Sequence, residues 1–243
     1  MQNIDYLFIV LLFVVQPIHG YFSYRKYIRR IATGAASNRV RLYRETMLLE
    51  WLAFAALGTA WIVLGRPATE LGFVTSSPMQ ITLGTGITVL FTAYLLYVWH
   101  VTRQMSDAEK AKQTDTLGDL VHFLPQDTRD YRHFVALSVT AGIVEELLYR
   151  GYTFWVLAHF MPLWAVVLVS SVAFGLAHTY QGAGGVVRVT LIGVAFGALY
   201  VFTGSIWLPM LAHAILDILQ GASLLEMAQR GSDQTHEQHP DHC

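Results

Sequence analysis

"GIVEELLYRG", residues 142–151, places Glu145 and Glu146 side by side within a long apolar run, with Arg150 four residues after Glu146. A charged side chain at the centre of a bilayer costs about 2.5 to 3.5 kcal/mol on insertion scales, so it usually faces a partner or a cavity. Glu146 and Arg150 have the spacing at which a glutamate and a basic residue pair on a helix. Because Glu145 is rotated by about 100° from Glu146 on a helix, that pair leaves Glu145 without a local partner.

This run is one of seven long apolar segments in a chain of 243 residues that is 54 % hydrophobic and 14 % charged. A soluble domain usually has about 25 % charged residues, and a bilayer core of roughly 30 Å requires about 20 helical residues. We therefore expect an all-α, polytopic integral membrane protein with about seven transmembrane helices. The segments are Ile4–Ile18, Met47–Leu64, Ile81–Val101, Phe134–Ala158, Leu163–Ala177, Val186–Phe202 and Ile206–Leu225.

The basic residues cluster in two of the loops between these segments. Of the 16 Lys and Arg, seven lie between the first two segments and five between the third and fourth. The positive-inside rule places both loops, Gly20–Glu45 and Thr102–Arg132, in the cytoplasm, where they face anionic lipid rather than nucleic acid. We expect a multi-pass inner (plasma) membrane protein with its N-terminus outside and its C-terminus cytoplasmic. Cysteines introduced at Ser37 and Thr75 should then be labelled from opposite sides.

The chain divides into three expected parts. Residues 1–132 hold three plain transmembrane helices with basic cytoplasmic loops, 133–225 hold most of the ionisable residues within apolar segments, and 226–243 form a disordered polar tail containing histidines. Besides Asp5 at the start of the first segment, the first three segments contain only Glu50 and His100 as acidic, basic or histidine residues, both near segment ends. The first segment lacks the basic residues that open a signal peptide, so we interpret it as a retained anchor. The single cysteine, Cys243, excludes an intramolecular disulfide.

Two further segments place polar residues four apart on one helical face. "FGLAHTYQG" carries Phe174 and His178, and "LPMLAHAILDILQG" carries His213 and Asp217. A lone histidine in an apolar helix is usually a packing residue, but two histidines beside an unpaired glutamate favour a site. A buried glutamate can act as a general base, and histidines orient water, donate to an oxyanion or bind a metal. The HExxH and GxSxG signatures are absent.

In this order, "EELLYRG", "FGLAHTYQG" and "HAILD" resemble the EExxxR, FxxxH and HxxxN or HxxxD motifs of the CPBP family. That family comprises CAAX-prenyl endopeptidases and bacterial bacteriocin-processing and immunity proteins. The segment "GALYVFTGSIWLPMLAHAILD" also resembles the family's last core helices. The resemblance covers about Phe134 to Gly221. It implies an intramembrane endopeptidase with a four-helix catalytic core and a membrane-associated substrate that carries a lipid or a leader sequence.

By this resemblance, Glu145 would activate the attacking water with help from His178. His213 and Asp217 would stabilise the oxyanion, and Glu146, Arg150 and Phe174 would support the site. Two mechanisms stay open, one metal-free and one with a divalent metal such as zinc, held by Glu145, His178 and His213. The family's eukaryotic members usually have Asn where this chain has Asp217. Because an ionised Asp repels an oxyanion, Asp217 must be protonated, orient His213 or bind a metal.

Two other classes of function stay open: a proton-coupled transporter, and a non-catalytic membrane immunity or scaffold protein of the same fold. The transporter predicts matching interrupted helices in two halves, and the sequence shows none.

Helix lengths place the three key residues at different depths. Glu145, His178 and His213 come out roughly 16, 6 and 20 Å from the cytoplasmic edge at 1.5 Å per residue. Residues of a single site must lie at similar depths in the membrane. We therefore expect "TGSIWLP", residues 203–209, to enter the interior as a loop, with Pro209 in the first turn of the last helix and a tilt of the helix ending at His178.

Overall fold

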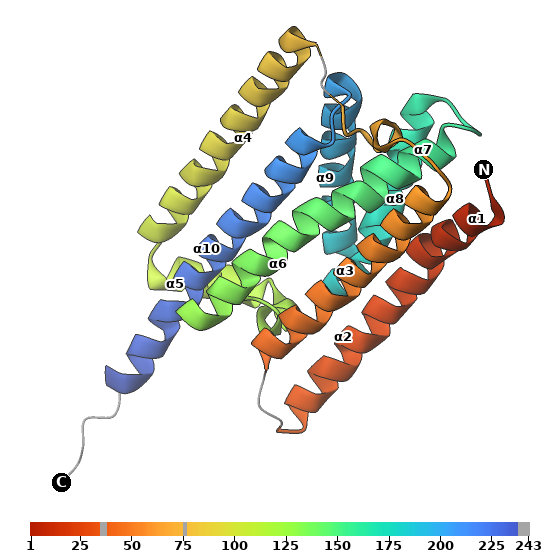
Figure 1. Cartoon of the computed structure of the whole chain (residues 1–243). Helices are drawn as coiled ribbons and strands as arrows, with labels where there is room; N and C mark the ends of the chain where they lie inside the picture. The colour runs from red at the N-terminus through yellow and green to blue at the C-terminus, as the bar shows by residue number, and fades with distance from the viewer. Residues whose placement is uncertain (35–37, 75–76, 238–243) are drawn as a thin grey trace.

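The computed structural model describes residues 1–34, 38–74 and 77–237, and side chains as far as Met227. Within that part the chain is helical and contains no strand (Figure 1). The longer helices are α1 (Asn3–Val10), α2 (Gln16–Ala32), α3 (Arg39–Val63), α4 (Pro78–Gln104), α5 (Asp107–Asp115), α6 (Thr128–Glu146), α7 (Thr153–Leu157), α8 (Leu163–Ala177), α9 (Gly182–Thr203) and α10 (Trp207–Glu237). Shorter helical segments are η1 (Leu11–Val15), η2 (Ala68–Leu71), η3 (Gly118–His122), η4 (Leu147–Tyr152) and η5 (Thr179–Gln181).

Five helices of the described part are long and apolar enough to cross a membrane, so the chain is an all-α, multi-pass membrane protein. They are Asn3–Ala32, Arg39–Val63, Pro78–Gln104, Thr179–Thr203 and Trp207–Met227. Two of the seven expected spans differ. The helix α8 has only 15 residues, about 22 Å at 1.5 Å per residue. The helix α6 begins with charged residues and ends at Glu145 and Glu146, which lowers its hydropathy.

Capping residues set where the long helices begin. The side chain of Asn38 accepts a hydrogen bond from the Arg41 backbone N–H, and that of Asp127 accepts one from Asp130. Ser77 caps α4 and is followed by Pro78, which lacks the N–H that a first helical turn leaves unpaired. These caps satisfy backbone N–H groups of the first helical turn and so fix where each helix begins.

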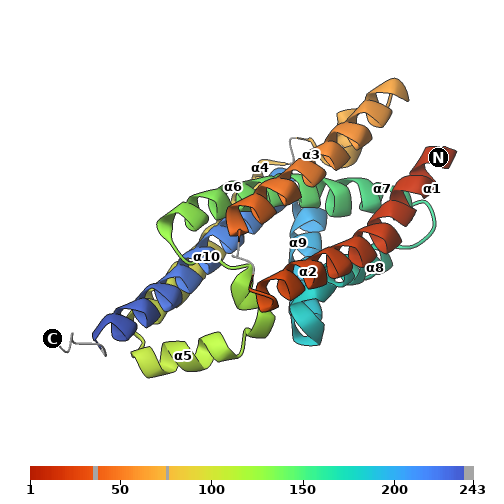
Figure 2. The same cartoon turned by 90° about the horizontal axis from the view of Figure 1, so that it is seen from below.

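The helix α6 lies at the centre of the fold, with α3 on one side and α10 on the other (Figure 1). The helices α8 and α9 pack against each other, whereas α5 lies outside the group of long helices (Figure 2). The main core joins residues from the first helices, such as Leu57 and Trp61, to Val144, Tyr149 and Phe174 from the later ones. The N-terminal helices therefore share one core with the helices that carry the three motifs.

The two basic loops lie at the same end of the molecule, where α2 ends and α6 begins (Figure 1). Three tyrosines hold the second loop against the first helices, because their hydroxyls donate to main-chain carbonyls. Tyr24 donates to Asp119 (2.6 Å), Tyr27 to His122 (3.1 Å) and Tyr43 to Phe123. Which side of the membrane this end faces stays a prediction, and Ser37 and Thr75 lie outside the described residues.

At the opposite end, the N-terminus is held by a bidentate ion pair between Asp5 and Arg66, with N–O distances of 2.7 and 2.8 Å. The guanidinium of Arg66 also lies 5.0 Å from the Trp61 ring and 4.5 Å from the Trp155 ring. The hydrogen bond that Arg66 donates to Asp5 raises the pKa of Arg66 above its ordinary value. Because Asp5 is 1 % exposed, α1 is fixed to the loop after α3.

The expected entry of residues 203–209 into the interior is confirmed in its central part. Ser205 and Ile206 are 1 % and 0 % exposed, and the Ile206 N–H donates to the Gly72 carbonyl at 3.0 Å. The helix α10 begins at Trp207, so Pro209 lies in its first turn. At its other end, α10 continues to Glu237, past the tail boundary at 226 that we predicted. His239, His242 and Cys243 lie outside the described residues.

Close approach of α6 and α10 depends on Gly142, so we expect Gly142→Ala to destabilise the protein. A Cβ there would lie 2.8 Å from the Met210 carbonyl oxygen and 2.9 Å from the Ala214 nitrogen, both of them backbone atoms. Overpacking of this kind costs about 1 to 3 kcal/mol. Gly58→Ala is the matched control, because a Cβ at Gly58 meets no atom within 4 Å. Thermal unfolding in detergent measures both, and equal melting temperatures would contradict the prediction.

Candidate active site

Glu146 and Arg150 form a fully buried pair at the centre of the site. Both residues are 0 % exposed, and Arg150 Nη1 donates to Glu146 Oε1 at 2.8 Å. Arg150 Nη2 donates to the carbonyl of Gly193 on α9 at 3.1 Å. Its guanidinium lies over the Phe174 ring, 4.4 Å from the centroid, so Phe174 contacts the pair directly. This arrangement links α6, η4, α8 and α9 around one cation.

His213 joins this pair from α10. Its Nδ1 lies 2.8 Å from Glu146 Oε1, so one carboxylate oxygen serves both Arg150 and His213. An ionised carboxylate only accepts hydrogen bonds, so Nδ1 carries the proton and donates. The Phe196 ring lies against the imidazole, with centroids 5.4 Å apart. The contacts fix the plane of the ring and aim Nε2 away from Glu146.

Two further carboxylates face that Nε2 atom. The distance from His213 Nε2 is 3.8 Å to Glu145 Oε2 and 3.6 Å to Asp217 Oδ2. Both distances are longer than a hydrogen bond, and polar groups at such separations are often bridged by water. The Glu145 side chain is 12 % exposed and that of Asp217 is 30 % exposed, whereas Glu146 is fully enclosed. Glu145 and Asp217 therefore lie on the open side of the site.

His178 lies at the end of α8, where the chain turns into η5. Its Nδ1 is 2.9 Å from the Phe174 carbonyl oxygen, which only accepts, so Nδ1 donates and Nε2 is left as an acceptor. The Phe174 ring contacts both histidines, with centroid distances of 4.9 Å to His178 and 5.9 Å to His213. The charge of Glu145 interacts with both histidines and with Asp217. The structure thus brings together the residues named from the sequence.

Several residues of this region were not expected from the sequence. Gly193 and Phe196 contact Arg150 and His213 from α9, and no polar motif marks either of them. Glu50 was dismissed as a residue near the end of a segment, yet its charge interacts with those of Glu145, His213 and Asp217. Glu50 lies seven residues from both Tyr43 and Leu57, which are buried. Residues seven apart lie on the same face of a helix, so this spacing places Glu50 on the inner face of α3.

The donors named for a metal do not form a metal site in the described part of the chain. There, no three His, Cys, Asp or Glu side chains group closely enough to hold an ion. Because these residues do not fit a metal, no step below passes through one.

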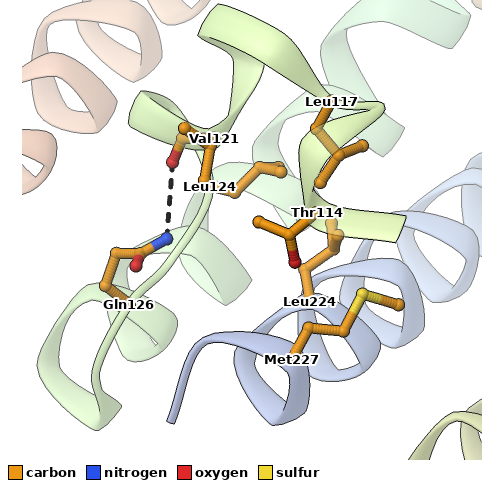
Figure 3. A pocket seen from close by; sticks show the side chains of 7 residues that line it. All are labelled: Thr114, Leu117, Val121, Leu124, Gln126, Leu224 and Met227. Carbon is orange, nitrogen blue, oxygen red and sulfur yellow. Dashed lines mark hydrogen bonds between the residues drawn. The ribbon is translucent and has the colours of Figure 1, made fainter. Parts of the chain in front are cut away.

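A cavity of about 30 Å³ lies elsewhere, between α5, the segment after it and α10 (Figure 3). Gln126 Nε2 closes one side by donating to the Val121 carbonyl at 3.4 Å. The cavity is lined by Thr114, Leu117, Val121, Leu124, Gln126, Leu224 and Met227. None of the candidate site residues lines this cavity, so it forms no part of the site.

Comparison with known proteins supports the same segment. The family model described as "Type II CAAX prenyl endopeptidase Rce1-like" matches residues 129–219, which include all seven residues named from the sequence. These residues are similar to the CPBP family. The "Putative membrane peptidase YdiL" of Bacillus subtilis (strain 168) is 26 % identical over 121 residues, which cover 50 % of this chain and 44 % of the relative. The match thus spans less than half of that relative, and no solved structure gives a significant match. The matched residues extend from the start of α6 into α10.

Proposed function

We propose that the protein is an intramembrane endopeptidase in which Glu145 activates the water that attacks a peptide bond. The main support for this proposal is the different surroundings of the two adjacent glutamates. Glu146 is enclosed and engaged by Arg150 and His213, whereas Glu145 is partly exposed and makes no hydrogen bond within the described part of the chain. A general base requires a carboxylate that can reach water, and Glu145 meets that requirement.

In this mechanism, Glu145 accepts a proton as the water oxygen bonds to the carbonyl carbon of the substrate. His178 assists through its free Nε2, which can accept a hydrogen bond from the same water. The carbonyl oxygen becomes an oxyanion and accepts a hydrogen bond from His213 Nε2, a role worth about 10²- to 10³-fold in comparable enzymes. When the C–N bond breaks, the proton held by Glu145 passes to the leaving amine.

Glu146 and Asp217 take supporting roles in this proposal. With carboxylates facing both of its ring nitrogens, His213 can donate from Nδ1 and Nε2 at once. Asp217 orients His213 instead of touching the oxyanion itself. Of the three roles that the sequence left open for Asp217, this one requires neither a metal nor a neutral acid.

The proposed substrate is a membrane-associated peptide that carries a lipid or a leader sequence, and the proposed location is the inner (plasma) membrane, with the C-terminus cytoplasmic. The family resemblance supports the substrate class, and the two basic loops support the orientation. Membrane lipids are the surrounding partners of the five long apolar helices.

Substrate proteomics tests the proposal. Cells that produce the wild-type chain and cells that produce Glu145→Gln are compared for new peptide N-termini in membrane and secreted fractions. We expect a small set of termini that depends on the wild-type chain. A third strain that lacks the chain separates the two ways in which the proposal can fail. If all three strains give the same termini, the protein acts without proteolysis, as an immunity protein, scaffold or transporter would; if only the strain without the chain differs, the protein cleaves peptides but Glu145 is not the base.

A further inference from the structure

The helix α3 carries a carboxyl group, on Glu50, that belongs to none of the three motifs and lies outside the matched residues 129–219. Seven residues separate Glu50 from Tyr43 and from Leu57, which are 0 % and 1 % exposed. Residues seven apart lie on the same face of a helix. Glu50 therefore points inward in the middle of α3, between two of its most buried residues.

The inward face of α3 at this level meets the part of α6 that carries Glu145. The indole Nε1 of Trp51 donates to Thr140 Oγ1 at 3.3 Å, which joins the two helices next to Glu50. Within this contact, the charge of Glu50 interacts with those of Glu145, His213 and Asp217. The side chain therefore approaches the proposed active site from α3, which packs against α6.

The position is energetically unfavourable for a carboxyl group. Glu50 Oε2 is enclosed and has no hydrogen-bond partner among the described residues. A buried polar atom without a partner costs about 1 to 3 kcal/mol, and an apolar residue of similar shape would avoid that cost. Since Glu145 and Asp217 lie in the same region, a charged Glu50 would also add to like-charge repulsion. Packing and charge therefore give no reason for an acid here.

We propose that Glu50 is a positioning residue of the active site, whose carboxyl group holds the Glu145 side chain and its water in place. This inference rests on the proposed proteolysis. Because one oxygen of Glu50 is enclosed, the group acts through Glu145 instead of touching the substrate. The active site would then extend beyond the matched residues 129–219, since α3 supplies one of its polar groups.

Two variants separate positioning from packing. Glu50→Leu removes the polar group, so we expect kcat to fall about ten- to hundredfold, as for misplaced catalytic groups, with KM changed less than about twofold. Its melting temperature should rise by about 2 to 4 °C, because an unpaired polar atom is removed. Glu50→Gln keeps size and hydrogen-bonding capacity, so it should retain at least about half of the wild-type kcat. The probe is a peptide found by the proteomic comparison, made with a fluorophore and a quencher on either side of the cleaved bond.

Glu45→Gln is the matched control, because Glu45 lies on the same helix with its side chain 56 % exposed, paired only with Arg41. It should change neither kcat nor melting temperature. A wild-type kcat in Glu50→Leu, or equal losses of kcat in the Leu and Gln variants, would overturn the inference. A lower melting temperature in both variants would indicate a packing role and overturn it too. Glu145→Gln is assayed in parallel. If that variant stays active, the proposed role of Glu145 as the base fails; if only Glu50→Leu stays active, the inference about Glu50 fails alone.

Discussion

Glu145→Gln should lower kcat by about two orders of magnitude or more, the typical contribution of a positioned general base, while the protein still folds. The amide keeps the size of the side chain but cannot accept the proton of the attacking water. Folding should survive because Glu145 makes no hydrogen bond within the described structure and because an amide costs less to bury than a carboxylate. Steady-state cleavage of the quenched peptide by detergent-purified protein measures the effect, with thermal unfolding measured on the same samples.

The result for Glu145→Gln is read against wild type and against Glu45→Gln, which lies on the surface of α3. A Glu145→Gln protein that cleaves at nearly the wild-type rate would end the assignment of Glu145 as the base. A loss of activity together with a large drop in melting temperature would show that Glu145 maintains the fold. In that case Glu145 and Glu146 would have exchanged roles.

Glu146→Gln should act mainly on stability, with a loss of about 3 to 5 kcal/mol, because removing one partner of a buried ion pair leaves the other charge unpaired. Both Arg150 and His213 should lose a charged hydrogen-bond partner, because each contacts Glu146 Oε1 at 2.8 Å. Thermal unfolding and the yield of folded protein in detergent measure this effect. The loss of stability should appear first, and a further loss of activity per folded molecule would reflect the contact between Glu146 and His213.

A double variant provides the control for Glu146. In Glu146→Gln with Arg150→Met, the carboxylate and the cation are removed together, so part of the lost stability should return. At the surface, Glu45→Gln breaks the exposed pair with Arg41, which contributes at most about 1 kcal/mol. If the double variant is less stable than Glu146→Gln alone, Arg150 stabilises the fold through Gly193 and Phe174 more than through Glu146.

The parts of the site that the sequence predicted are those set by local helix geometry. The pairing of Glu146 with Arg150, and the position of Asp217 near His213, follow from a spacing of four residues. The same rule left Glu145 without a local partner on its own helix, and in the structure the side chain facing it, His213, comes from α10. The all-α membrane fold followed from apolar run length, which is also a local property.

The parts that the sequence did not predict depend on how distant helices pack. The hydrogen bond between His213 and Glu146 joins residues 67 positions apart, and no motif specifies it. The acceptor at Gly193 is a backbone carbonyl, which every residue possesses. The residue type at position 193 therefore does not reveal that it binds Arg150. Glu50 lies near the end of an apolar segment, which is typical of a residue at the membrane surface. Its place in the site depends instead on the face of α3 that packs against α6. Span counting was imprecise at α8 because a short helix that ends inside the protein need not match the bilayer thickness.

The three tyrosine hydroxyls that hold residues 119–123 all donate to main-chain carbonyls, at Asp119, His122 and Phe123. Every amino acid presents such a carbonyl, so exchanging the side chains of Asp119 or His122 leaves the acceptors in place. Homologous chains are therefore free to diverge at those two positions while the tyrosines stay fixed. For protein engineering, the exposed side chain of Asp119 is consequently a suitable attachment point for a fluorophore.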